Sequence, residues 1–337
     1  MNKSFKFMSR FFTLVVCCTI LSAVLSACGY GERKENINNS SKKVEEQVNV
    51  KDIRLKEDGS KVYVCLKDAF NSVGNEYITK GSKAEIKSGM ETLKVTERSK
   101  EIGTTFSKII IPDEIINVNG ELYASLESLK EIIDGRVCYS KDTKKVTIKP
   151  EMKLEYSKGF SVKYLKGGVK KITDGNNRIL ILIPREKEVS QAYKNENVVK
   201  IPVKDVLVSS SNHASFLKSL EEIPSLTAVA LDSNRWNIDD IKKGIEEKRI
   251  SNVCQGGNYD YNKIRVLNPE IAFTYNGEQA QADLMKRLGD IKIPYAVDNG
   301  YIEKDPLGKM EWIKFIAAFY DKEEVAEKVF NDAISNR

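Results

Sequence analysis

The side chains best suited to bind a small molecule gather at four points in the last third of the chain. Each point directly follows a short apolar stretch that predicts a β-strand. Strands that alternate with helices predict a parallel sheet, and ligands bind beyond the carboxyl ends of the strands in open sheets of this kind. The four predicted strand ends are Ser209–His213, Asp232–Trp236, Tyr275–Gly277 and Asn299–Tyr301. The chemistry that they indicate is ligand binding.

These strand ends carry two kinds of binding group. Aromatic rings can stack on a flat chelate or macrocycle. The free N–H groups of the helix predicted after Ser211 favour an anionic group. Each aromatic residue can also be an ordinary core residue, and His213 can contact a ligand or only cap its helix. The candidate ligand-binding residues are Ser209, Ser210, Ser211, Asn212, His213, Trp236, Tyr275 and Tyr301.

Catalysis has little support in the sequence. The chain contains one histidine, so neither a zinc-protease motif nor a multi-histidine metal site can be built. No nucleophile elbow and no phosphate-binding glycine loop is present. The paired acids Asp239-Asp240 and Glu246-Glu247 fall on predicted solvated helix faces. We therefore expect a binding protein with no enzymatic activity, no cofactor and no bound metal ion of its own.

The six cysteines do not form a disulfide framework. Cys17 and Cys18 fall in an N-terminal export signal, and Cys28 directly follows it. The other three are Cys65, Cys138 and Cys254, each in an apolar stretch. An odd number without a close pair argues against disulfides and against a zinc site. We expect these three to be small buried hydrophobic residues.

The segment from Leu154 onward predicts an α/β fold. It opens with two β-stretches, Phe160–Tyr164 and Arg178–Ile183, that indicate a meander with a turn at Asp174-Gly175. Short apolar strands then alternate with amphipathic helices, which predicts a Rossmann-like parallel sheet covered on both faces. The predicted elements are strands Val206–Ser209, Ala228–Leu231, Ile271–Thr274 and Tyr295–Val297 and helices His213–Glu222, Ile238–Glu247, Tyr261–Leu267 and Ala280–Leu288.

Residues 310–337 give the strongest helix signal in the chain. An aromatic and aliphatic stripe runs at helical spacing through Trp312, Phe315, Ile316, Phe319 and Tyr320. A continuous helix over these residues would extend roughly 42 Å at 1.5 Å per residue. This is longer than one small lobe requires, so we predict a strut between two bodies.

Residues 51–150 contain a weak internal repeat. Val62–Phe70 aligns with Leu122–Lys130, and each copy predicts a strand that leads into a helix and then into two further β-stretches. The stretch from Asn119 to Leu126, with the strands around Arg136 and Val146, resembles the copper-amine-oxidase N-terminal-like stalk domain. The resemblance implies an α+β spacer of exported proteins, and it implies neither copper nor an oxidase.

The N-terminus predicts export and lipid anchoring. Residues 1–10 are basic, and residues 11–24 are apolar but too short to span a bilayer comfortably. The sequence Leu25-Ser26-Ala27-Cys28-Gly29 resembles a bacterial lipobox, which implies cleavage after residue 27 and acylation of Cys28. Residues 28–50 are polar and predict a flexible tether. We expect a lipid-anchored protein on the extracytoplasmic face of the cell membrane.

The charge of the mature chain excludes one class of partner. Cleavage after residue 27 removes Lys3, Lys6 and Arg10 and no acidic residue, so the formal charge of +6 becomes +3. This mild excess is spread along the chain, whereas a nucleic-acid-binding protein concentrates Lys and Arg on one face. We expect no nucleic-acid partner.

Three stretches of the last segment resemble the solute-binding proteins of ABC importers whose two lobes are joined by one rigid helix. They are Asp260–Ile271, Glu303–Trp312 and Ser209–Ser211. The resemblance implies that residues 151–309 form the first lobe and residues 310–337 the interlobe helix. It also implies an ABC permease as partner and an iron-siderophore, haem or cobalamin-like ligand. The lack of a histidine cluster disfavours bare zinc or manganese and leaves an organic metal chelate or a cobalamin-like molecule.

The chain departs from this family in three places. The second lobe is expected after residue 337, so we expect a truncated protein or a second lobe encoded separately, with the aromatic stripe exposed in this chain alone. The family glutamate that docks onto the permease is replaced by Asn262, and Lys309 replaces the usual arginine. The alternative is a surface-anchored interaction or scaffold protein without transport activity.

Overall fold

The computed structural model describes residues 52–335. The predicted export signal, the tether and the acylation site Cys28 lie outside these residues. Among residues 52–335, no helix is both long and apolar enough to cross a membrane.

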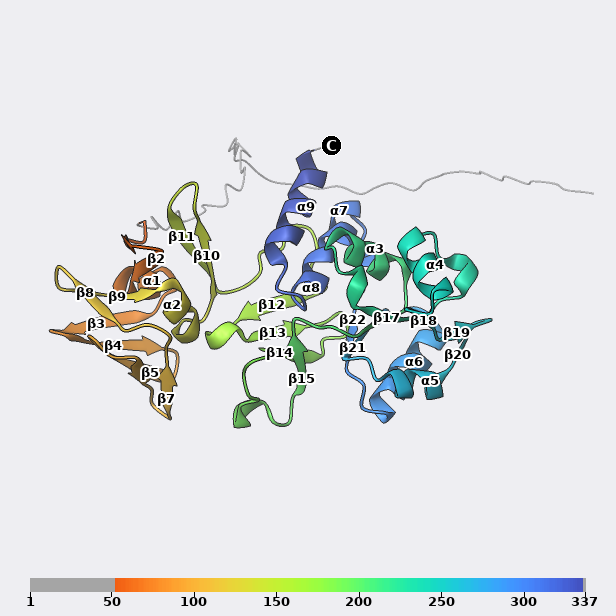
Figure 1. Ribbon diagram of the computed structural model, residues 1–337, viewed down its shortest axis with the longest axis horizontal. Helices are drawn as coiled ribbons and strands as arrows, with labels where there is room; N and C mark the ends of the chain where they lie inside the picture. Colours follow the sequence, from red (N-terminus) through yellow and green to blue (C-terminus); the bar gives the residue numbers. More distant parts are fainter. Residues whose placement is uncertain (1–51, 336–337) are drawn as a thin grey trace, which may run out of the picture. The chain divides into compact units, whose positions relative to one another are not determined.

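The predicted internal repeat is present in the first part of the chain (Figure 1). Each copy consists of a strand, a seven-residue helix and a β-hairpin. The first strands of the two copies pair antiparallel, with Val64 opposite Ala124. These residues are equivalent at the repeat spacing of 60, so the copies meet at a local two-fold axis. The elements are β2 (Lys61–Cys65), α1 (Leu66–Ser72), β3 (Glu76–Lys80) and β4 (Lys83–Ser88), then β9 (Glu121–Ser125), α2 (Leu126–Ile132), β10 (Arg136–Ser140) and β11 (Lys145–Lys149).

Five further strands complete this α+β part: β1 (Leu55–Asp58), β5 (Glu91–Thr96), β6 (Glu101–Gly103), β7 (Lys108–Ile110) and β8 (Ile116–Val118). One sheet has the order β1-β2-β9-β8, and a second contains β3 to β7 in chain order. Phe70, Leu93 and Leu129 belong to one hydrophobic core that is built only from residues of this segment.

A small mixed sheet follows and confirms the predicted meander. It contains β12 (Ser161–Tyr164), β13 (Lys170–Thr173), β14 (Ile179–Pro184) and β15 (Asn197–Ile201). The first three strands pair antiparallel, and β15 lies parallel to β14. Its apolar residues join the core of the next part of the chain.

The predicted parallel sheet is confirmed. Its strands are β16 (Val206–Val208), β17 (Leu226–Val229), β18 (Ser251–Asn252), β21 (Ile271–Thr274) and β22 (Tyr295–Val297), in the spatial order β18-β17-β16-β21-β22. All four neighbouring pairs are parallel. In order of appearance this arrangement is 3-2-1-4-5, the doubly wound order, in which the direction of winding reverses between the first and fourth strands. That point lies between β16 and β21.

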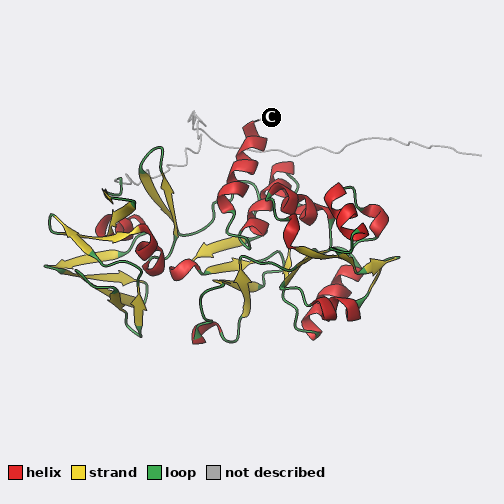
Figure 2. Cartoon of the chain, viewed as in Figure 1, coloured by secondary structure: helices red, strands yellow, loops and turns green. Residues whose placement is uncertain are grey.

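Helices cover both faces of the sheet (Figure 2). Val206 and Val208 face one core, which includes residues of α3 (Ser211–Ser219) and α4 (Asp239–Glu246). Leu207 points to the opposite face, where it shares a core with α5 (Tyr261–Leu267) and α6 (Gln279–Asp290). This alternation follows from the two-residue period of a strand. A two-stranded hairpin, β19 (Cys254–Gln255) and β20 (Asn258–Tyr259), lies between β18 and α5 in the chain.

The predicted continuous helix over residues 310–337 is wrong. The described part of this segment contains three helices, α7 (Pro306–Glu311), α8 (Ile313–Ala317) and α9 (Glu323–Ser335). Asp321 adopts a left-handed conformation with a φ of 56° in the turn before α9. Few residues other than glycine, asparagine and aspartate adopt this conformation, and it ends a helix. The chain therefore changes direction before α9.

The expectation that the aromatic stripe is exposed in this chain alone is also wrong. Trp312, Phe315 and Phe319 are fully buried. The ring of Phe160, which precedes β12, lies 4.7 Å from that of Trp312 and 5.3 Å from that of Phe315. On the sheet side, the ring of Phe273 in β21 lies 5.1 Å from that of Phe319. The stripe thus packs between the parallel sheet and the segment that leads into β12, which closes the core without an added domain.

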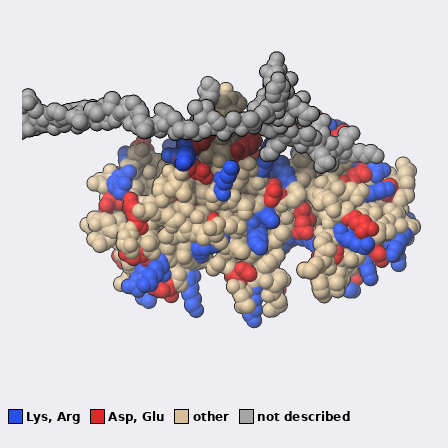
Figure 3. Space-filling view, turned by 180° about the vertical axis from the view of Figure 1, so that it is seen from behind, with Lys and Arg blue, Asp and Glu red and all other residues tan. Residues whose placement is uncertain are grey.

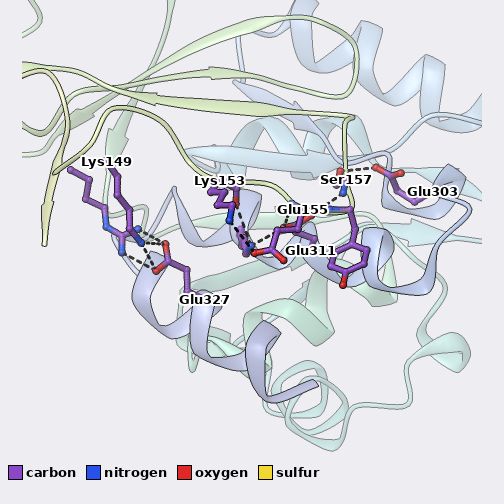
Figure 4. A network of polar contacts seen from close by, with 10 residues as sticks. Lys149, Lys153, Glu155, Ser157, Glu303, Glu311 and Glu327 are labelled. Atoms are coloured by element: carbon purple, nitrogen blue, oxygen red, sulfur yellow. Dashed lines mark hydrogen bonds and ion pairs between the residues drawn. The ribbon is translucent and has the colours of Figure 1, made fainter. Parts of the chain in front are cut away.

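A buried carboxylate fixes α7 and α8 to the segment before β12 (Figure 4). Glu311 is fully buried and accepts hydrogen bonds from the backbone N–H groups of Glu155, Tyr156 and Ser157 at 2.8–3.2 Å. The ammonium group of Lys314 donates to it at 2.7 Å. Burial acts to raise the pKa of Glu311, but the Lys314 ammonium and the three N–H groups outweigh it and hold that pKa below its ordinary value. We call Glu311, Lys314 and the backbone of residues 155–157 the Glu311 clamp.

We expect Glu311→Gln to lower the free energy of unfolding by about 3 kcal/mol, because it leaves the ammonium group of Lys314 buried without a counter-charge. Chemical denaturation at neutral pH measures this loss. Glu311→Gln combined with Lys314→Met should recover part of it, since the unpaired charge is then removed. Glu155→Gln is the matched control. The Glu155 side chain is half-exposed, and its nearest cation, Lys153, lies 3.9 Å away, so we expect a change within about 0.5 kcal/mol. An equal loss in Glu155→Gln and Glu311→Gln would contradict the assignment.

Candidate functional site

A cavity of about 240 Å³ lies at the carboxyl edge of the parallel sheet, where β16 and β21 end. This is the switch point of the doubly wound order, the position at which such sheets bind ligands. The residues that line it come from the ends of β16, β17, β21 and β22 and from α3 and α7. They are Ser209, Ser210, Ser211, Asn212, His213, Phe216, Leu231, Arg235, Tyr275, Asp298, Gly300, Tyr301 and Lys309.

Seven of the eight side chains predicted from the sequence to bind a ligand line this cavity. The continuous segment from Ser209 to His213 supplies five, and Tyr275 and Tyr301 supply the other two. The sheet brings them together because β16, β21 and β22 are neighbours and run in the same direction.

Trp236, the eighth predicted residue, does not line the cavity. Its side chain is only 2% exposed and belongs to the core of the α3 and α4 face. Its indole N–H donates to the carbonyl of Leu231 at 3.2 Å. The alternative that an aromatic residue at a strand end is an ordinary core residue therefore holds for Trp236. The neighbouring Arg235 lines the cavity instead.

The start of α3 forms one wall of the cavity. The Ser210 hydroxyl accepts a hydrogen bond from the backbone N–H of His213 at 3.3 Å and caps the helix. Ser209 is fully buried and donates from Oγ to the side-chain oxygen of Gln281 at 2.9 Å. Gln281 in turn donates to the hydroxyl of Tyr259 at 2.8 Å. Because the Ser209 hydroxyl already donates its hydrogen to Gln281, the Ser209 oxygen can only accept a further hydrogen bond.

A buried histidine and a buried carboxyl group face each other within the cavity lining. His213 is 2% exposed and Asp298 4% exposed, and Nε2 of His213 lies 3.7 Å from Oδ2 of Asp298. Burial lowers the pKa of His213 to about 3, so the ring is neutral at physiological pH. Burial raises the pKa of Asp298 to about 7, although the N–H of Gly300, 2.7 Å from Oδ1, acts in the opposite direction. The Asp298 carboxyl group therefore changes its protonation state near neutral pH.

Two tyrosines form the aromatic part of the lining. The rings of Tyr275 and Tyr301 meet edge to face at 5.9 Å, and Tyr301 is 43% exposed. Gly277 permits this contact. It has a φ of 117°, and a Cβ atom there would lie 2.7 Å from the Tyr301 hydroxyl. A planar group can stack on the exposed part of Tyr301.

Two cations and one acid are the charged side chains of the cavity lining. On the face shown in Figure 3, Lys and Arg lie among Asp and Glu. In the cavity lining the charged side chains are Arg235, Lys309 and Asp298. Since Asp298 is partly protonated at neutral pH, the lining carries net positive charge and favours an anionic group.

Six lining residues were not among the candidate side chains, although Arg235 and Gly300 lie within the predicted strand ends Asp232–Trp236 and Asn299–Tyr301. Two had an available signal. Phe216 is three residues after His213 on α3 and so shares its helix face, and Lys309 stands within the stretch Glu303–Trp312 that was singled out. Asp298 directly follows β22 and Gly300 lies two residues further on, while Leu231 and Arg235 follow β17. For these four residues the sequence predicts the loop but not whether the side chain points into the cavity, because the direction of a loop side chain depends on tertiary structure.

The remaining predicted residues lie elsewhere. Asn262, at the position of the family docking glutamate, is exposed in the first turn of α5. Cys65 is buried as expected, whereas Cys138 and Cys254 are half-buried, and all three are free thiols. Within residues 52–335, no three His, Cys, Asp or Glu side chains converge in a geometry that could hold a metal ion.

Comparison with known proteins gives partial matches. No protein-family model matches the chain. An uncharacterized lipoprotein of Methanocaldococcus jannaschii is 31% identical over 147 residues, which cover 42% of this chain and 35% of that protein. A second uncharacterized protein of the same organism is 38% identical over 144 residues, which cover 40% of this chain and 42% of that protein. The matches thus span about two fifths or less of either curated relative.

Solved structures that are similar include solute-binding proteins. A periplasmic haem-binding protein from Pseudomonas aeruginosa has a TM-score of 0.33 at 14% identity, over 40% of this chain and 44% of that chain. The triscatecholate siderophore-binding protein FeuA from Bacillus subtilis has a TM-score of 0.32 at 15% identity, over 41% of this chain and 45% of that chain. Both scores are below 0.5.

We expect Asp298→Asn to remove a pH dependence of stability. An acid whose pKa is raised on folding binds more protons in the folded than in the unfolded state, so its contribution to stability falls as pH rises from about 4 to about 7. The introduced amide oxygen can still accept from Gly300, but the amide does not titrate. The stability of the variant relative to the native protein should therefore increase by about 2 kcal/mol between pH 5 and pH 7. Denaturation curves across this range measure the difference, and the exposed Asp290→Asn is the control. A pH-independent difference would show that Asp298 titrates normally.

Proposed function

We propose that this chain is a lipid-anchored solute-binding component of an ABC importer and that it binds an iron-siderophore, haem or cobalamin-like ligand. One observation carries the proposal. Residues selected from the sequence because they follow predicted strands line a single cavity at the switch point of the doubly wound sheet. Such a cavity is the default position of a ligand site in this kind of sheet.

The lining supports a ligand that is both anionic and partly planar. Arg235 and Lys309 supply positive charge, and the first N–H groups of α3 point outward from the helix start, where they stabilise anions. Tyr275 and Tyr301 supply ring surface, of which part is exposed. Carboxylate-bearing chelates and macrocycles combine these two features. The cavity volume of about 240 Å³ suits one portion of such a ligand rather than all of it.

The anchor belongs to the proposal as well. Acylation of Cys28 would hold the protein on the extracytoplasmic face of the membrane, and residues 29–50 would serve as the tether. Support comes from the lipobox-like sequence and from the partial match to a Methanocaldococcus jannaschii protein whose name describes it as a lipoprotein. Two acyl chains suffice for durable anchoring.

Docking to a permease would use the exposed face of α5. Asn262 stands there in place of the acidic residue of the resembled family. A neutral amide lacks the charge-assisted hydrogen bond that a carboxylate forms with arginine. We propose that docking at this position is weaker than in that family.

Titration with ferric siderophores, haem and cobalamin tests the binding function. We expect quenching of intrinsic fluorescence by at least one of them and a loss of affinity of about tenfold in Lys309→Ala, since a hydrogen bond to a charged group contributes roughly 1.5–3 kcal/mol. Lys304→Ala is the matched control, because Lys304 is an exposed lysine five residues away that does not line the cavity. Equal affinities of the Lys309→Ala and Lys304→Ala variants would show that the ligand does not bind in this cavity. No binding by any of the three ligands would favour a scaffold role.

A further inference from the structure

The sheet of β3 to β7 has one buried face and one exposed face. Side chains alternate between the two, because a strand has a two-residue period. Ile86, Leu93 and Ile102 are fully buried on the inner face and belong to the core of the α+β part. The alternate residues point outward, and we call this outer surface the lysine face. Its charged side chains are Lys80, Lys83, Lys87, Lys94 and Lys108 with Glu76, Glu85 and Glu101.

The lysine face carries an excess of two positive charges. Each of its glutamates is paired with one lysine at 2.7–2.9 Å, namely Glu76 with Lys87, Glu85 with Lys80 and Glu101 with Lys108. Lys83 and Lys94 are both exposed and form no salt bridge within residues 52–335. The hydrogen bond from Lys80 and the nearby charge of Lys94 hold the pKa of Glu85 below its ordinary value. The positive charge of this face is therefore only partly neutralised by its own acids.

Three large apolar side chains beside the lysine face are exposed. Met90, in the turn between β4 and β5, is 96% exposed, and Phe106, in the turn between β6 and β7, is 81% exposed. The two turns lie side by side, because the backbone N–H of Thr92 donates to the hydroxyl of Thr105 at 2.8 Å. Ile110, on the edge strand β7, is 68% exposed and lies on the outer side of the sheet. Binding to a membrane interface uses both kinds of group, since buried apolar area and attraction to anionic lipids add.

We propose that the lysine face docks on the surface of an anionic lipid bilayer. Phe106 and Met90 enter the headgroup region, and Lys83 and Lys94 bind phosphate groups of the lipids. The association is non-covalent and leaves the protein fold unchanged. It goes beyond solute binding and assigns the α+β part a role that does not involve the cavity.

The apolar turns favour a bilayer over a soluble polyanion. A dissolved polyanion could pair with Lys83 and Lys94, but it would leave Phe106 and Met90 in water. A bilayer offers phosphate oxygens and an apolar phase within roughly 5–10 Å of each other. The proposed acylation of Cys28 would also keep the sheet near a membrane, because an extended chain from residue 28 to residue 52 reaches at most about 80 Å. A tether of this length raises the effective concentration of the bilayer at the lysine face.

Co-sedimentation with vesicles tests the proposal. The protein is the mature chain, residues 28–337, with Cys28→Ser so that no acyl chain contributes. At about 50 mM salt, we expect it to bind vesicles of phosphatidylcholine and phosphatidylglycerol about tenfold more tightly than vesicles of phosphatidylcholine alone, because each cation near an anionic surface adds to the attraction. Raising the salt concentration to about 500 mM should remove most of this difference, since salt screens exposed charges.

A pair of lysine substitutions tests the charged contribution. Lys83→Gln combined with Lys94→Gln removes the excess of two positive charges, so we expect the affinity for the anionic vesicles to fall about tenfold, towards that for neutral ones. Lys286→Gln combined with Lys304→Gln is the matched control. It removes the same charge from two exposed lysines of the α/β part and should change the affinity little.

The apolar contribution is tested at the two turns. Met90→Ser combined with Phe106→Ser should weaken binding to the anionic vesicles about tenfold and leave its salt dependence in place. Val266→Ser is the control, because Val266 is 82% exposed on α5, in the other part of the chain. We expect no loss of vesicle binding in this variant.

Fluorescence of Phe106→Trp reports whether this turn enters the bilayer. The native Trp236 and Trp312 are 2% and 0% exposed, so their emission is shielded from the lipid. We expect the emission of Phe106→Trp to shift to shorter wavelength with anionic vesicles and to be quenched by brominated acyl chains. Val266→Trp should show neither change. This measurement also decides the question if the double serine variant does not fold.

Equal binding to both kinds of vesicle, or no binding to either, would overturn the proposal. Equal losses in the two pairs of lysine variants would do the same. Binding to polyglutamate that requires Lys83 and Lys94, without binding to vesicles, would also overturn it and would identify a soluble polyanion or an acidic protein as the partner. The proposed solute-binding function is measured in solution without vesicles, so it stands or fails independently.

Discussion

The arrangement of the elements around the cavity depends on the buried carboxylate of Glu311. It joins three consecutive backbone N–H groups before β12 to the end of α7, and Lys314 supplies its counter-charge one turn further along. Glu303 makes a second connection, since it accepts from the Ser157 hydroxyl at 2.6 Å and from the Trp312 indole at 3.2 Å (Figure 4). Lys309 lies on α7 between these two acids. The clamp therefore determines where one of the two fixed cations of the cavity is held.

This geometry gives a physical account of the stretch Glu303–Trp312. Its two glutamates bind the chain before β12, Asp305 caps α7 through the N–H of Leu307, and Trp312 contributes to the core. Only Lys309 reaches the cavity. Most residues of this stretch therefore stabilise the fold, and only Lys309 lines the cavity. A substitution at either glutamate would displace Lys309 indirectly, by releasing α7.

The sequence predicted the sheet well and the last helices poorly, for an identifiable reason. Strands such as Ile271–Thr274 and Tyr295–Val297 coincide with β21 and β22, because continuous apolar runs leave few alternatives to a buried strand. The carboxyl ends of those strands then located seven of eight candidate residues. The turn around Asp321 carries no glycine or proline, so helical periodicity passed through it unbroken. The pairing of His213 with Asp298 joins residues 85 positions apart and depends on the sheet order, which local patterns do not contain.

Because the aromatic stripe is buried, Trp312, Phe315 and Phe319 present no free surface to another molecule. If Trp312 and Phe319 were exposed, another domain or protein would be needed to bury their rings. Because Phe160 and Phe273 already cover them, the core of the α3 side is complete within the described residues. Two apolar side chains next to each other in the chain remain exposed: Tyr301, which lines the cavity, is 43% exposed, and Ile302 is 60% exposed. Covering these two side chains would contribute roughly 25 cal/mol per Å² of apolar area removed from water.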